Sequence, residues 1–349
     1  MTYRVVQFGT GNVGKMCARS VLRHPEMELV GVYVTNPDKA GRDAGELVGV
    51  DPLGLPAIDD LEELCALDAD VVLHAPLPSM QVNDDPSYDE HVIGRLLRSG
   101  KNVITTVGYL YPKAYGPDVV ERLEAACAAG GVSVHGTGAN PGFMSELLPL
   151  TLSGMSDRID RIYVVEASSF HRYPSPEVIL GMLGMGKSPE EFAPFTARYR
   201  GWLTALFSES VWMLADGLAL AIDGVEASLE VRTTDSAHDI AAGHIPAGSV
   251  AAHRWLWEGK VGDRAVIVLE AVYRTRPQEA PEWTSQHAFV IEGEPTFRFE
   301  VGAGWCSDGL LATAAHAVNA IPAVVGAAPG IRTFLDLPLI VGRHTARAR

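Results

Sequence analysis

The sequence is poor in cysteine and in positive charge. Four cysteines stand far apart along the 349 residues, and no two of them form a C-x-x-C pair. This spacing argues against a disulfide framework and against a zinc site, and it fits reduced thiols. The 28 lysines and arginines are outnumbered by 43 acidic residues, which gives a net charge of −15. So few cations make nucleic acid a poor partner, because phosphate binding depends on patches of lysine and arginine.

Long uncharged stretches are also scarce. The run from 309 to 331 lacks a formal charge, but it contains His316, Asn319 and two prolines. These residues favour a buried helix and loop over a membrane span. The first predicted strand begins at residue 3, which leaves no room for a signal peptide before it. We therefore expect a soluble, cytoplasmic protein with neither a membrane nor a nucleic acid as partner.

The first half of the chain alternates predicted strands with predicted helices. Apolar runs typical of buried strands occur at residues 3–8, 29–34, 71–75, 102–106 and 132–135. Helical patterns follow several of them, at residues 12–23, 87–98 and 118–129. This βαβ alternation predicts an α/β fold with a doubly wound parallel sheet of the Rossmann type.

The pattern changes after residue 142, where strands begin to follow one another directly. Strands are predicted at residues 158–168, 227–234, 250–257, 265–273, 287–291 and 296–301, and helices at 174–185 and 199–222. Short turns such as EGKVGD, residues 258–263, join the strands. We predict an α+β second domain at 144–304 with a mixed or antiparallel sheet, whose open face forms a homodimer. The first domain is predicted at 1–143, with 305–349 packing back on it.

The stretch VVQFGTGNVGK, residues 5–15, joins the first strand to the first helix through Gly-X-Gly-X-X-Gly. In this context Gly9 makes a tight turn, Gly11 lets a pyrophosphate approach the backbone, and Gly14 lets helix and strand pack closely. Amides at the start of the helix then face the phosphates. We predict a dinucleotide site formed by Gly9, Thr10, Gly11, Asn12, Val13 and Gly14.

The end of the second strand decides which dinucleotide is bound. An NAD site usually carries an acidic residue there, which binds the ribose 2′-hydroxyl. This chain has Thr35 and Asn36 instead, with Lys39 and Arg42 just beyond. Without a carboxylate at this point a 2′-phosphate is not repelled, and the two cations can bind it. The pattern favours NADP, although Asp38 is close enough to leave NAD open.

Further coenzyme contacts are expected beyond the carboxyl ends of other strands, where ligands of such sheets bind. Three segments supply them: HAPLPS with Ala75 and Pro76, TTVGYLYP with Val107, Gly108 and Tyr109, and HGTGANPGF with Asn140 and Pro141. The Tyr109 ring either reaches the nicotinamide or packs under a loop. Asn140 either caps a helix or contacts the nicotinamide carboxamide or the substrate.

Four segments taken together resemble one family. They are VVQFGTGNVGK, GKNVITTV, GTGANPGF and EASSFHRYPSPE, in that order over most of the chain. The sequence resembles the dihydrodipicolinate-reductase-like oxidoreductases, and within them the branch of 2,4-diaminopentanoate dehydrogenase and the native amine dehydrogenases. The resemblance implies a two-domain, usually dimeric NAD(P)-dependent enzyme with its substrate cleft between the domains. Such enzymes interconvert a carbonyl or imine with an amine or another reduced product.

Two positions depart from the family pattern. Dihydrodipicolinate reductases carry paired histidines followed by a lysine, whereas EASSFHRYPS has only His171, followed by Arg172. This difference argues against dihydrodipicolinate reduction. The amine dehydrogenases place a glutamate just past the strand written NVITTV here, where this chain has Gly108 and Tyr109. Reductive amination and the reduction of a carbonyl or alkene without ammonia therefore both stay open.

Two other functions are alternatives to these. Sugar and inositol dehydrogenases with the same two-domain plan carry Glu-Lys-Pro after the corresponding strand, whereas here Tyr111-Pro112-Lys113 is out of order. A protein that binds NADP as a sensor, without catalysis, is an alternative that the missing glutamate keeps open.

Hydride transfer from a nicotinamide needs a proton donor or a group that stabilises the developing charge. The candidates are Tyr109, His171 and Glu166. His171 is either a proton donor or a surface or interface histidine. Glu166 orients a donor, takes over the task of the missing glutamate, or forms an ion pair with a neighbouring arginine. An apolar pocket suited to a small ketone or imine is predicted from Phe143, Phe170, Tyr173 and Met182. The remaining histidines have no spacing typical of metal ligands, so we predict no metal.

Overall fold

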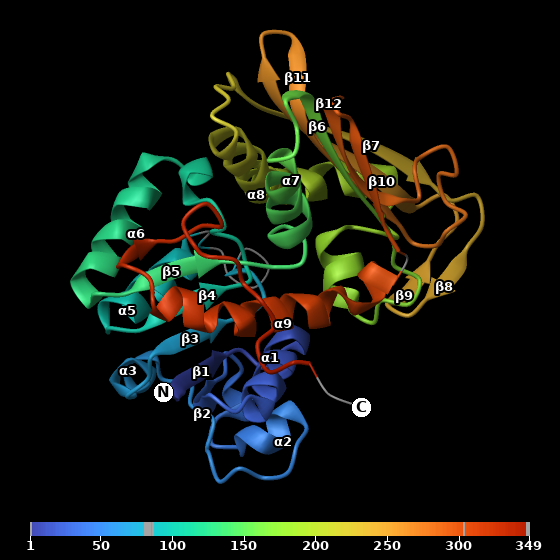
Figure 1. Cartoon of the computed structure of the whole chain (residues 1–349). Helices are drawn as coiled ribbons and strands as arrows, with labels where there is room; N and C mark the ends of the chain where they lie inside the picture. The colour runs from blue at the N-terminus through green and yellow to red at the C-terminus, as the bar shows by residue number, and fades with distance from the viewer. Residues whose placement is uncertain (1, 80–84, 86, 303, 347–349) are drawn as a thin grey trace. The chain divides into compact units, whose positions relative to one another are not determined.

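Figure 1 shows the computed structural model, which describes residues 2–79, 85, 87–302 and 304–346. The chain divides into two compact units. One contains Met1–Phe143 and Asp308–Arg349, and the other contains Met144–Ser307. The predicted domains differ from these units only at residues 305–307.

The sheet of the first unit is wholly parallel, in the order β14-β5-β4-β3-β1-β2. Its strands are β1 (Tyr3–Phe8), β2 (Met27–Tyr33), β3 (Val71–His74), β4 (Asn102–Thr105), β5 (Ser133–Gly136) and β14 (Gly330–Ile331). The predicted doubly wound parallel sheet is confirmed. The short edge strand β14 was not predicted, because two residues are too few to show a pattern.

Helices cover both faces of this sheet. They are α1 (Asn12–Arg23), α2 (Ala44–Val48), α3 (Leu61–Ala66), α5 (Tyr88–Arg98), α6 (Pro117–Gly130) and α9 (Gly304–Val325), with the 3-10 helices η1 (Pro37–Lys39) and η2 (Pro112–Tyr115). Adjacent residues of β1 show how the two faces arise. Val5 shares a core with Cys17 of α1 and Ile321 of α9, whereas Val6 shares one with Ile93 of α5. Because alternate side chains of a strand point to opposite faces, a strand covered on both sides is apolar throughout.

Among the described residues, one helix is long and apolar enough to cross a membrane by length and composition. The stretch Asp308–Val325 of α9 has a mean hydropathy of 1.3, and 33% of it is buried. A core helix passes the same test. Ala314 and Ile321 of this helix are fully buried in one cluster with Val5 and Leu73 of the sheet, so α9 covers one face of that sheet.

The sheet of the second unit is mixed, in the order β13-β12-β6-β11-β10-β7, and this confirms the predicted α+β arrangement. Its strands are β6 (Arg158–Ser169), β7 (Gly224–Thr233), β10 (Val250–Val261), β11 (Arg264–Arg274), β12 (His287–Glu294) and β13 (Phe297–Val301). Strands β6 and β11 are parallel neighbours, while the other pairs are antiparallel. The parallel pair places the carboxyl ends of β6 and β11 at the same edge.

Helix α8 (Pro189–Gly217) packs on one face of this sheet. Phe207 of α8 stacks on Trp257 with ring centroids 4.1 Å apart, and Trp257 stacks on Trp255 at 5.7 Å. In Figure 1, α7 (Leu148–Ser153) lies on the same side of the sheet as α8. The other face of the sheet is not covered by either helix.

Several predicted bounds in the second unit were wrong. Helix α8 begins ten residues before the predicted helix at 199–222, because Ser188 and Glu191 form a capping box at its start. It ends at Gly217, before the predicted end. The predicted helix 174–185 is only the π-helical turn η4 (Glu177–Met182). Residues 258–261, expected in a turn, continue β10 instead. A small hairpin of β8 (His238–Ile240) and β9 (Gly243–Ile245) was not predicted.

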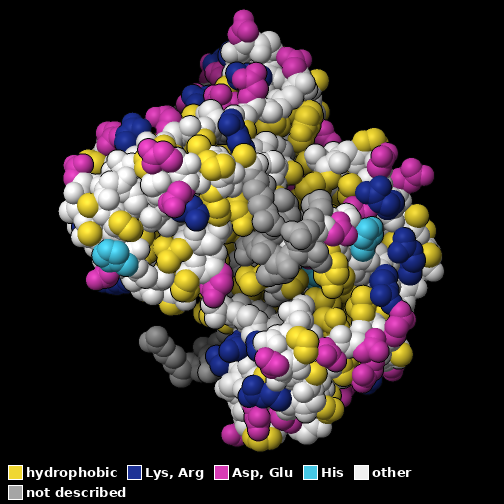
Figure 2. All heavy atoms as spheres, turned by 180° about the vertical axis from the view of Figure 1, so that it is seen from behind, with side chains coloured by type: hydrophobic (Ala, Val, Ile, Leu, Met, Phe, Trp, Pro, Cys, Tyr) yellow, Lys and Arg dark blue, Asp and Glu magenta, His cyan; other side chains and the backbone are white. Residues whose placement is uncertain are grey.

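Figure 2 shows lysine and arginine side chains interspersed with aspartate and glutamate on the face that it presents.

Candidate functional site

The glycine-rich turn after β1 owes its shape to two of its glycines. Gly9 has φ +89°, and a Cβ at this position would lie 2.8 Å from the carbonyl oxygen of Ala75. A Cβ on Gly14 would lie 2.1 Å from the carbonyl oxygen of Gly9, so only glycine lets α1 approach the turn this closely. At Gly11, by contrast, a Cβ would meet nothing within 4 Å, which leaves open space beside the backbone.

The start of α1 offers backbone donors rather than side-chain caps. Gly11 occupies the N-cap position with no side-chain hydrogen bond, and the first turn has no acidic residue. Gly11 and Asn12 are exposed, and Val13 is half-buried. The first amides of a helix have no partner within the helix, and the helix dipole makes this end positive. An anion such as a pyrophosphate therefore fits this end of α1.

The residues after β2 lie beside this turn. Lys39 extends its Nζ to 3.2 Å from the hydroxyl of Thr10. Asn36 caps η1 by accepting a hydrogen bond from the Asp38 amide at 2.9 Å, while Thr35 and Arg42 are exposed. The structure thus joins Thr10 and Lys39, which the sequence separates by 29 positions, and leaves Arg42 at the surface.

The ends of β3 and β4 carry the next predicted group. The Ala75 amide donates to the carbonyl of Phe8 at 3.0 Å, which fixes Ala75 and the half-buried Pro76 next to the glycine-rich turn. Buried His74 contacts the Thr105 hydroxyl through Nδ1 at 3.0 Å, and burial lowers the pKa of His74 to about 3. His74 is therefore a neutral part of the core at neutral pH.

Tyr109 follows Val107 and Gly108 at the end of β4. Gly108 has φ +118° and Tyr109 has φ +60°, so the chain turns sharply here. The Tyr109 ring is half-buried against Tyr115, with ring centroids 5.2 Å apart. The contact with Tyr115 is compatible with both predicted alternatives for this ring.

The segment 137–143 beyond β5 is held by α9. The Ala139 amide donates to the Thr313 hydroxyl at 3.0 Å, and the Thr137 hydroxyl lies 2.6 Å from Nδ1 of His316. The ring of Phe143 packs edge-on against His316 at 5.5 Å. Thr313 and His316, on one face of α9, therefore hold both ends of the glycine-rich loop at 137–143.

Asn140 does not cap a helix, so that alternative was wrong. Asn140 and Pro141 form a turn with a cis peptide bond, which the Phe143 amide closes by donating to the carbonyl of Gly138 at 3.0 Å. The next helical turn, η3 (Phe143–Leu147), begins only after this loop. Asn140 therefore lies in a loop at the carboxyl end of the sheet.

Buried His135 and half-buried His316 lie behind this loop. His135 Nδ1 donates to the carbonyl of Arg332 at 2.6 Å, and both His135 and His316 contact the ring of Phe334. Burial lowers the pKa of each histidine to about 4. Nε2 of both rings is buried without a hydrogen-bond partner in the described part of the chain.

The candidates in the second unit gather around β6 and β11. Glu166 accepts hydrogen bonds from the Ser168 hydroxyl at 3.0 Å and from the Tyr273 hydroxyl at 3.4 Å. Phe170 packs against Tyr273 at 5.3 Å and against Tyr173 at 5.7 Å. Glu166 and Phe170 thus both contact Tyr273, and Tyr173 contacts Phe170.

His171 and Met182 make other contacts in the second unit. His171 Nδ1 lies 3.1 Å from the hydroxyl of Ser169, whose side chain alternates to the face of β6 opposite Glu166. Met182 ends η4 and packs half-buried on the core of the unit.

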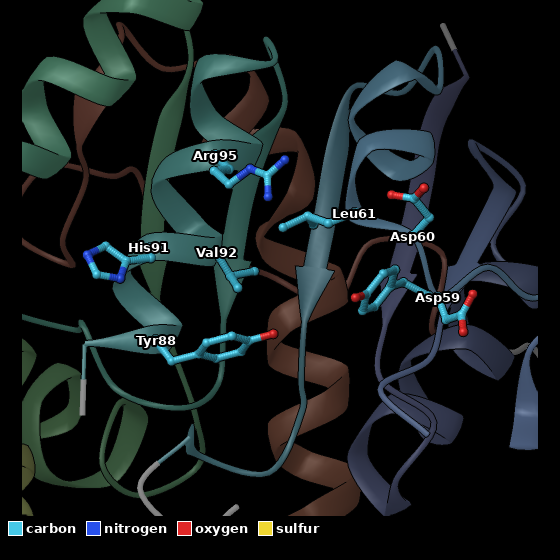
Figure 3. Close-up of a pocket in the computed structure, with 8 residues that line it drawn as sticks. Asp59, Asp60, Leu61, Tyr88, His91, Val92 and Arg95 are labelled. Carbon is cyan, nitrogen blue, oxygen red and sulfur yellow. The ribbon is translucent and has the colours of Figure 1, made fainter. Parts of the chain in front are cut away.

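A pocket of about 480 Å³ opens next to the end of β2. It is lined by Tyr33, Asp59, Asp60, Leu61, Tyr88, His91, Val92 and Arg95. Figure 3 shows Leu61 and Val92 pointing toward one another, with Tyr88 beside them. The Tyr33 ring stacks on Phe8 at 4.3 Å, and burial raises its pKa. The pocket thus combines apolar walls, phenol groups and carboxylates.

Comparison with known proteins places this arrangement in a family. The family model for the 2,4-diaminopentanoate dehydrogenase C-terminal domain matches residues 143–347, which is more than half of the chain. The chain belongs to the 2,4-diaminopentanoate dehydrogenase family. The model for the dihydrodipicolinate reductase N-terminus matches residues 3–83 of this family member, which include the glycine-rich turn.

Two relatives align with the family member almost end to end. An amine dehydrogenase from Streptomyces virginiae is 32% identical, over 96% of each chain. A 2,4-diaminopentanoate dehydrogenase from Acetoanaerobium sticklandii is 26% identical, over 96% of this chain and 93% of the relative. The chain is an NAD(P)-dependent oxidoreductase, as the resemblance implied.

The structure of an amine dehydrogenase from Mycobacterium smegmatis matches the fold of this family member. It aligns with a TM-score of 0.81 at 22% identity and covers 98% of both chains. The match supports the two-unit fold.

Four residues that hold the candidate site of this family member in place were not predicted from the sequence. Buried Gln7 donates to the carbonyl of Gly9 at 3.1 Å, and a polar residue inside an apolar strand could have pointed to it. Thr313 and His316 share one face of an otherwise apolar helix through their i, i+3 spacing. Tyr273 gives no signal in the sequence, because its role depends on the pairing of β11 with β6.

Proposed function

We propose that the chain is an NADP(H)-dependent enzyme that interconverts a small apolar ketone or imine with the corresponding amine. Its family supports nicotinamide-dependent redox chemistry. The relatives named amine dehydrogenase and 2,4-diaminopentanoate dehydrogenase support a nitrogen-containing substrate. The observation that carries the choice of NADP is Lys39, which lies beside Thr10 at the glycine-rich turn.

The 2′-phosphate of the coenzyme is bound after β2 in this proposal. NADP differs from NAD by this phosphate, so a cation at this position favours NADP. Lys39 is half-buried and is held next to the turn, whereas Thr35, Asn36 and Arg42 are exposed. Lys39 is therefore the principal contact, and Arg42 contributes a weaker, solvent-screened attraction.

The adenine ring occupies the pocket of Figure 3. The pocket begins at Tyr33, the last residue of β2, whose carbonyl accepts a hydrogen bond from the Gly9 amide at 2.9 Å. A ligand bound at the glycine-rich turn therefore has this pocket within its reach. Tyr88 and Leu61 give the flat and apolar walls that a purine ring needs.

When bound, the reduced nicotinamide supplies a hydride to the carbon of the carbonyl or imine. The protein positions the substrate and supplies the accompanying proton. Tyr109 in the first unit, and Glu166 and His171 in the second, are the candidate groups. Val107, Gly108, Asn140 and Pro141 shape the backbone around the coenzyme at the carboxyl ends of β4 and β5. Reductive amination consumes one carbonyl compound, one ammonium ion, one hydride and one proton, and releases one water.

The missing glutamate at Gly108-Tyr109 makes ammonia dependence the decisive measurement. NADPH oxidation is followed with small ketones, with and without ammonium chloride at constant ionic strength. Turnover only with ammonium supports the proposal. Turnover that is independent of ammonium makes the chain a carbonyl or alkene reductase. Tight NADPH binding without turnover under either condition makes it a sensor.

The protein acts as a cytoplasmic homodimer in this proposal. The face of the second sheet away from α8 supports such an interface, because it carries half-buried Leu256 among charged side chains. Arg254 on this face bonds Glu270 at 2.7 Å and Glu230 at 3.1 Å. A light-scattering mass equal to one chain would rule the dimer out.

A further inference from the structure

A buried glutamine lies in the sheet directly before the glycine-rich turn. Gln7 of β1 is fully buried, two residues after Val5 and opposite Leu73 of β3. Side chains two residues apart share a face of a strand, so Gln7 faces the apolar cluster that Val5 and Leu73 form with α1 and α9. An amide in such surroundings costs free energy unless it is hydrogen-bonded, so its contacts show what it does.

The Gln7 side chain holds main-chain carbonyls of two neighbouring strands. Its Nε2 donates to the carbonyl of Phe8 at 2.9 Å, of Gly9 at 3.1 Å and of Leu73 at 3.2 Å. Carbonyl oxygens only accept hydrogen bonds, so these contacts also identify which end of the amide is Nε2. The side chain thus ties the first glycine of the turn to the end of β1 and to β3.

The other end of the amide indicates that Gln7 does more than stabilise the fold. Gln7 Oε1 is buried without a hydrogen-bond partner in the described part of the chain. A buried acceptor without a partner destabilises the folded state, and an apolar side chain of the same length avoids this penalty. The net contribution of Gln7 to stability is therefore small, and its effect is expected at the turn.

The hydrogen bond to Gly9 sets the direction of the next main-chain amide. The peptide between Gly9 and Thr10 is trans, so its carbonyl and its N–H point in opposite directions. The carbonyl faces Gln7 and the start of α1, where a Cβ on Gly14 would lie 2.1 Å from it. The Thr10 N–H therefore faces the other side, and it donates no hydrogen bond in the described part of the chain.

The groups next to the Thr10 amide suit an anion. The Thr10 hydroxyl lies 3.2 Å from Nζ of Lys39, and the first amides of α1 follow at the exposed Gly11 and Asn12. Rotation of the Gly9–Thr10 peptide would replace the N–H by a carbonyl oxygen, which repels an anion. Glycine permits such a rotation more readily than other residues, so a bond that holds the Gly9 carbonyl has a consequence for binding.

We propose that Gln7 is a positioning residue for the coenzyme, which holds the Gly9–Thr10 peptide so that the Thr10 N–H donates to the pyrophosphate. This inference rests on the coenzyme site of the proposed function and adds a residue that acts on it from inside the sheet. NADPH and NADH share the pyrophosphate. Gln7 therefore affects both coenzymes equally, whereas Lys39 distinguishes them.

Gln7→Met removes the donor and keeps the length of the side chain. Coenzyme fluorescence should show binding weakened about 3- to 10-fold, equally for NADPH and NADH, as expected when a neutral hydrogen bond is lost. The urea midpoint should stay close to that of the wild type, because the unpaired Oε1 is removed as well. Unchanged affinity for both coenzymes, or a loss confined to NADPH, would overturn the inference.

Ile321→Val is the matched control for a general loss of stability. Ile321 of α9 is fully buried in the apolar cluster that Gln7 faces, and it makes no hydrogen bond to the turn through its side chain. Removal of one methylene from such a core lowers the urea midpoint. The affinity of Ile321→Val for both coenzymes should nevertheless equal that of the wild type.

Gln7→Glu keeps the shape of the side chain and makes the donor titratable. A protonated carboxyl donates one hydrogen bond, whereas a carboxylate only accepts and is repelled by the carbonyls that Nε2 contacts. Burial raises the pKa of a carboxyl, so the group gains its charge as the pH rises through the neutral range. The inference thus predicts that Gln7→Glu binds coenzyme well in weak acid and poorly in weak base.

The charges around this position keep the test simple. Burial raises the pKa of Cys17 on α1 to about 12 and lowers the pKa of His74, at the end of β3, to about 3. Both groups therefore stay neutral between weak acid and weak base. The Lys39 ammonium lies near Thr10 in the wild type and in the variant alike.

The measurement is titration calorimetry with the oxidised coenzymes, as the ratio of the variant Kd to the wild-type Kd at each pH. The ratio should be about 3 or less at about pH 5.5 and about 10 or more at about pH 8.5. Circular dichroism checks that the variant is folded at both values, and Gln7→Met decides if it is not. A ratio that does not change with pH would contradict the inference.

The two proposals fail in different ways. A wild type that binds neither coenzyme refutes both of them. Coenzyme binding without ammonium-dependent turnover refutes the proposed reaction, and the Gln7 titrations then still decide the role of Gln7. Ammonium-dependent turnover with equal coenzyme affinities in the wild type and Gln7→Met refutes the role of Gln7 alone.

Discussion

Replacing Lys39 with alanine tests the choice of coenzyme most directly. Its Nζ is 3.2 Å from Thr10 Oγ1, in the turn proposed to bind the pyrophosphate. Two unit charges about 4 Å apart attract by about 4 kcal/mol at an effective dielectric constant of about 20. Desolvation reduces this, and a hydrogen bond to a charged group contributes about 1.5–3 kcal/mol net. We therefore expect Lys39→Ala to weaken NADPH binding about 10- to 150-fold, a tenfold change being about 1.4 kcal/mol.

Arg42→Ala should have a smaller effect, because Arg42 is exposed and water screens its charge. An exposed ion pair contributes up to about 1 kcal/mol, which is about 5-fold in Kd. NADH lacks the 2′-phosphate, so neither substitution should change its affinity by more than about 2-fold. The preference for NADPH over NADH in binding affinity should also weaken as salt is added, since the screening length falls from about 10 Å at 0.1 M to about 3 Å at 1 M.

The assay is a titration of coenzyme fluorescence with NADPH and NADH for each variant. Tyr88→Ala is the matched comparison, because Tyr88 lines the pocket proposed for the adenine that both coenzymes share. It should weaken both by the same factor. Arg98→Ala, an exposed cation at the end of α5, should weaken neither. Equal losses for NADPH and NADH in Lys39→Ala would refute the role of Lys39 in binding the 2′-phosphate.

Three further substitutions test the geometry around the coenzyme. Gly14→Ala should lower the free energy of unfolding in urea by about 1–3 kcal/mol, because its Cβ would lie 2.1 Å from a backbone oxygen. Gly11→Ala, whose Cβ meets nothing within 4 Å, should leave the stability nearly unchanged. Equal losses of stability in the two variants would contradict this. Tyr109→Phe should slow single-turnover hydride transfer without changing coenzyme affinity, and an unchanged rate would move the proton donor elsewhere. Thr313→Val should lower the free energy of unfolding by about 1–3 kcal/mol, because the Ala139 amide loses its acceptor. Thr313→Ser keeps the hydroxyl and should retain the stability. Equal losses in the two variants would show that the hydroxyl is not responsible.

The first unit could be predicted from the sequence because its signals are local. Strands buried on both faces are continuous apolar runs, and α1 follows the glycine-rich turn directly. The roles of Gly9 and Gly14 also depend on neighbours nearby in the chain or at the end of an adjacent strand. The pocket at Tyr33 was not predicted, because Asp59 and Tyr88 meet there only when α3 and α5 pack on one face of the sheet.

The second unit was harder because its contacts are distant in sequence. The start of α8 depends on a capping box at Ser188, and the predicted pattern began only where its apolar residues become dense. Glu166 and Tyr273 are 107 residues apart and meet through the register of a parallel strand pair. An apolar alternation shows that a strand has a buried face, but it does not show which strand lies beside it.

This contrast bears on how the enzyme can change its substrate while keeping its coenzyme. Coenzyme binding, as proposed, depends on backbone amides and on glycines whose replacement would create clashes with backbone atoms, as at Gly14. The candidate proton donors, by contrast, are side chains that follow or end strands, so they do not shape the sheet itself. The resemblance leads us to expect a glutamate after β4, where this chain has Gly108 and Tyr109, yet Glu166 offers a carboxylate that two hydroxyls hold in place. The absence of a carboxylate after β4 is therefore poor evidence against reductive amination, because the reaction requires a charge at the substrate and not at one position in the sequence.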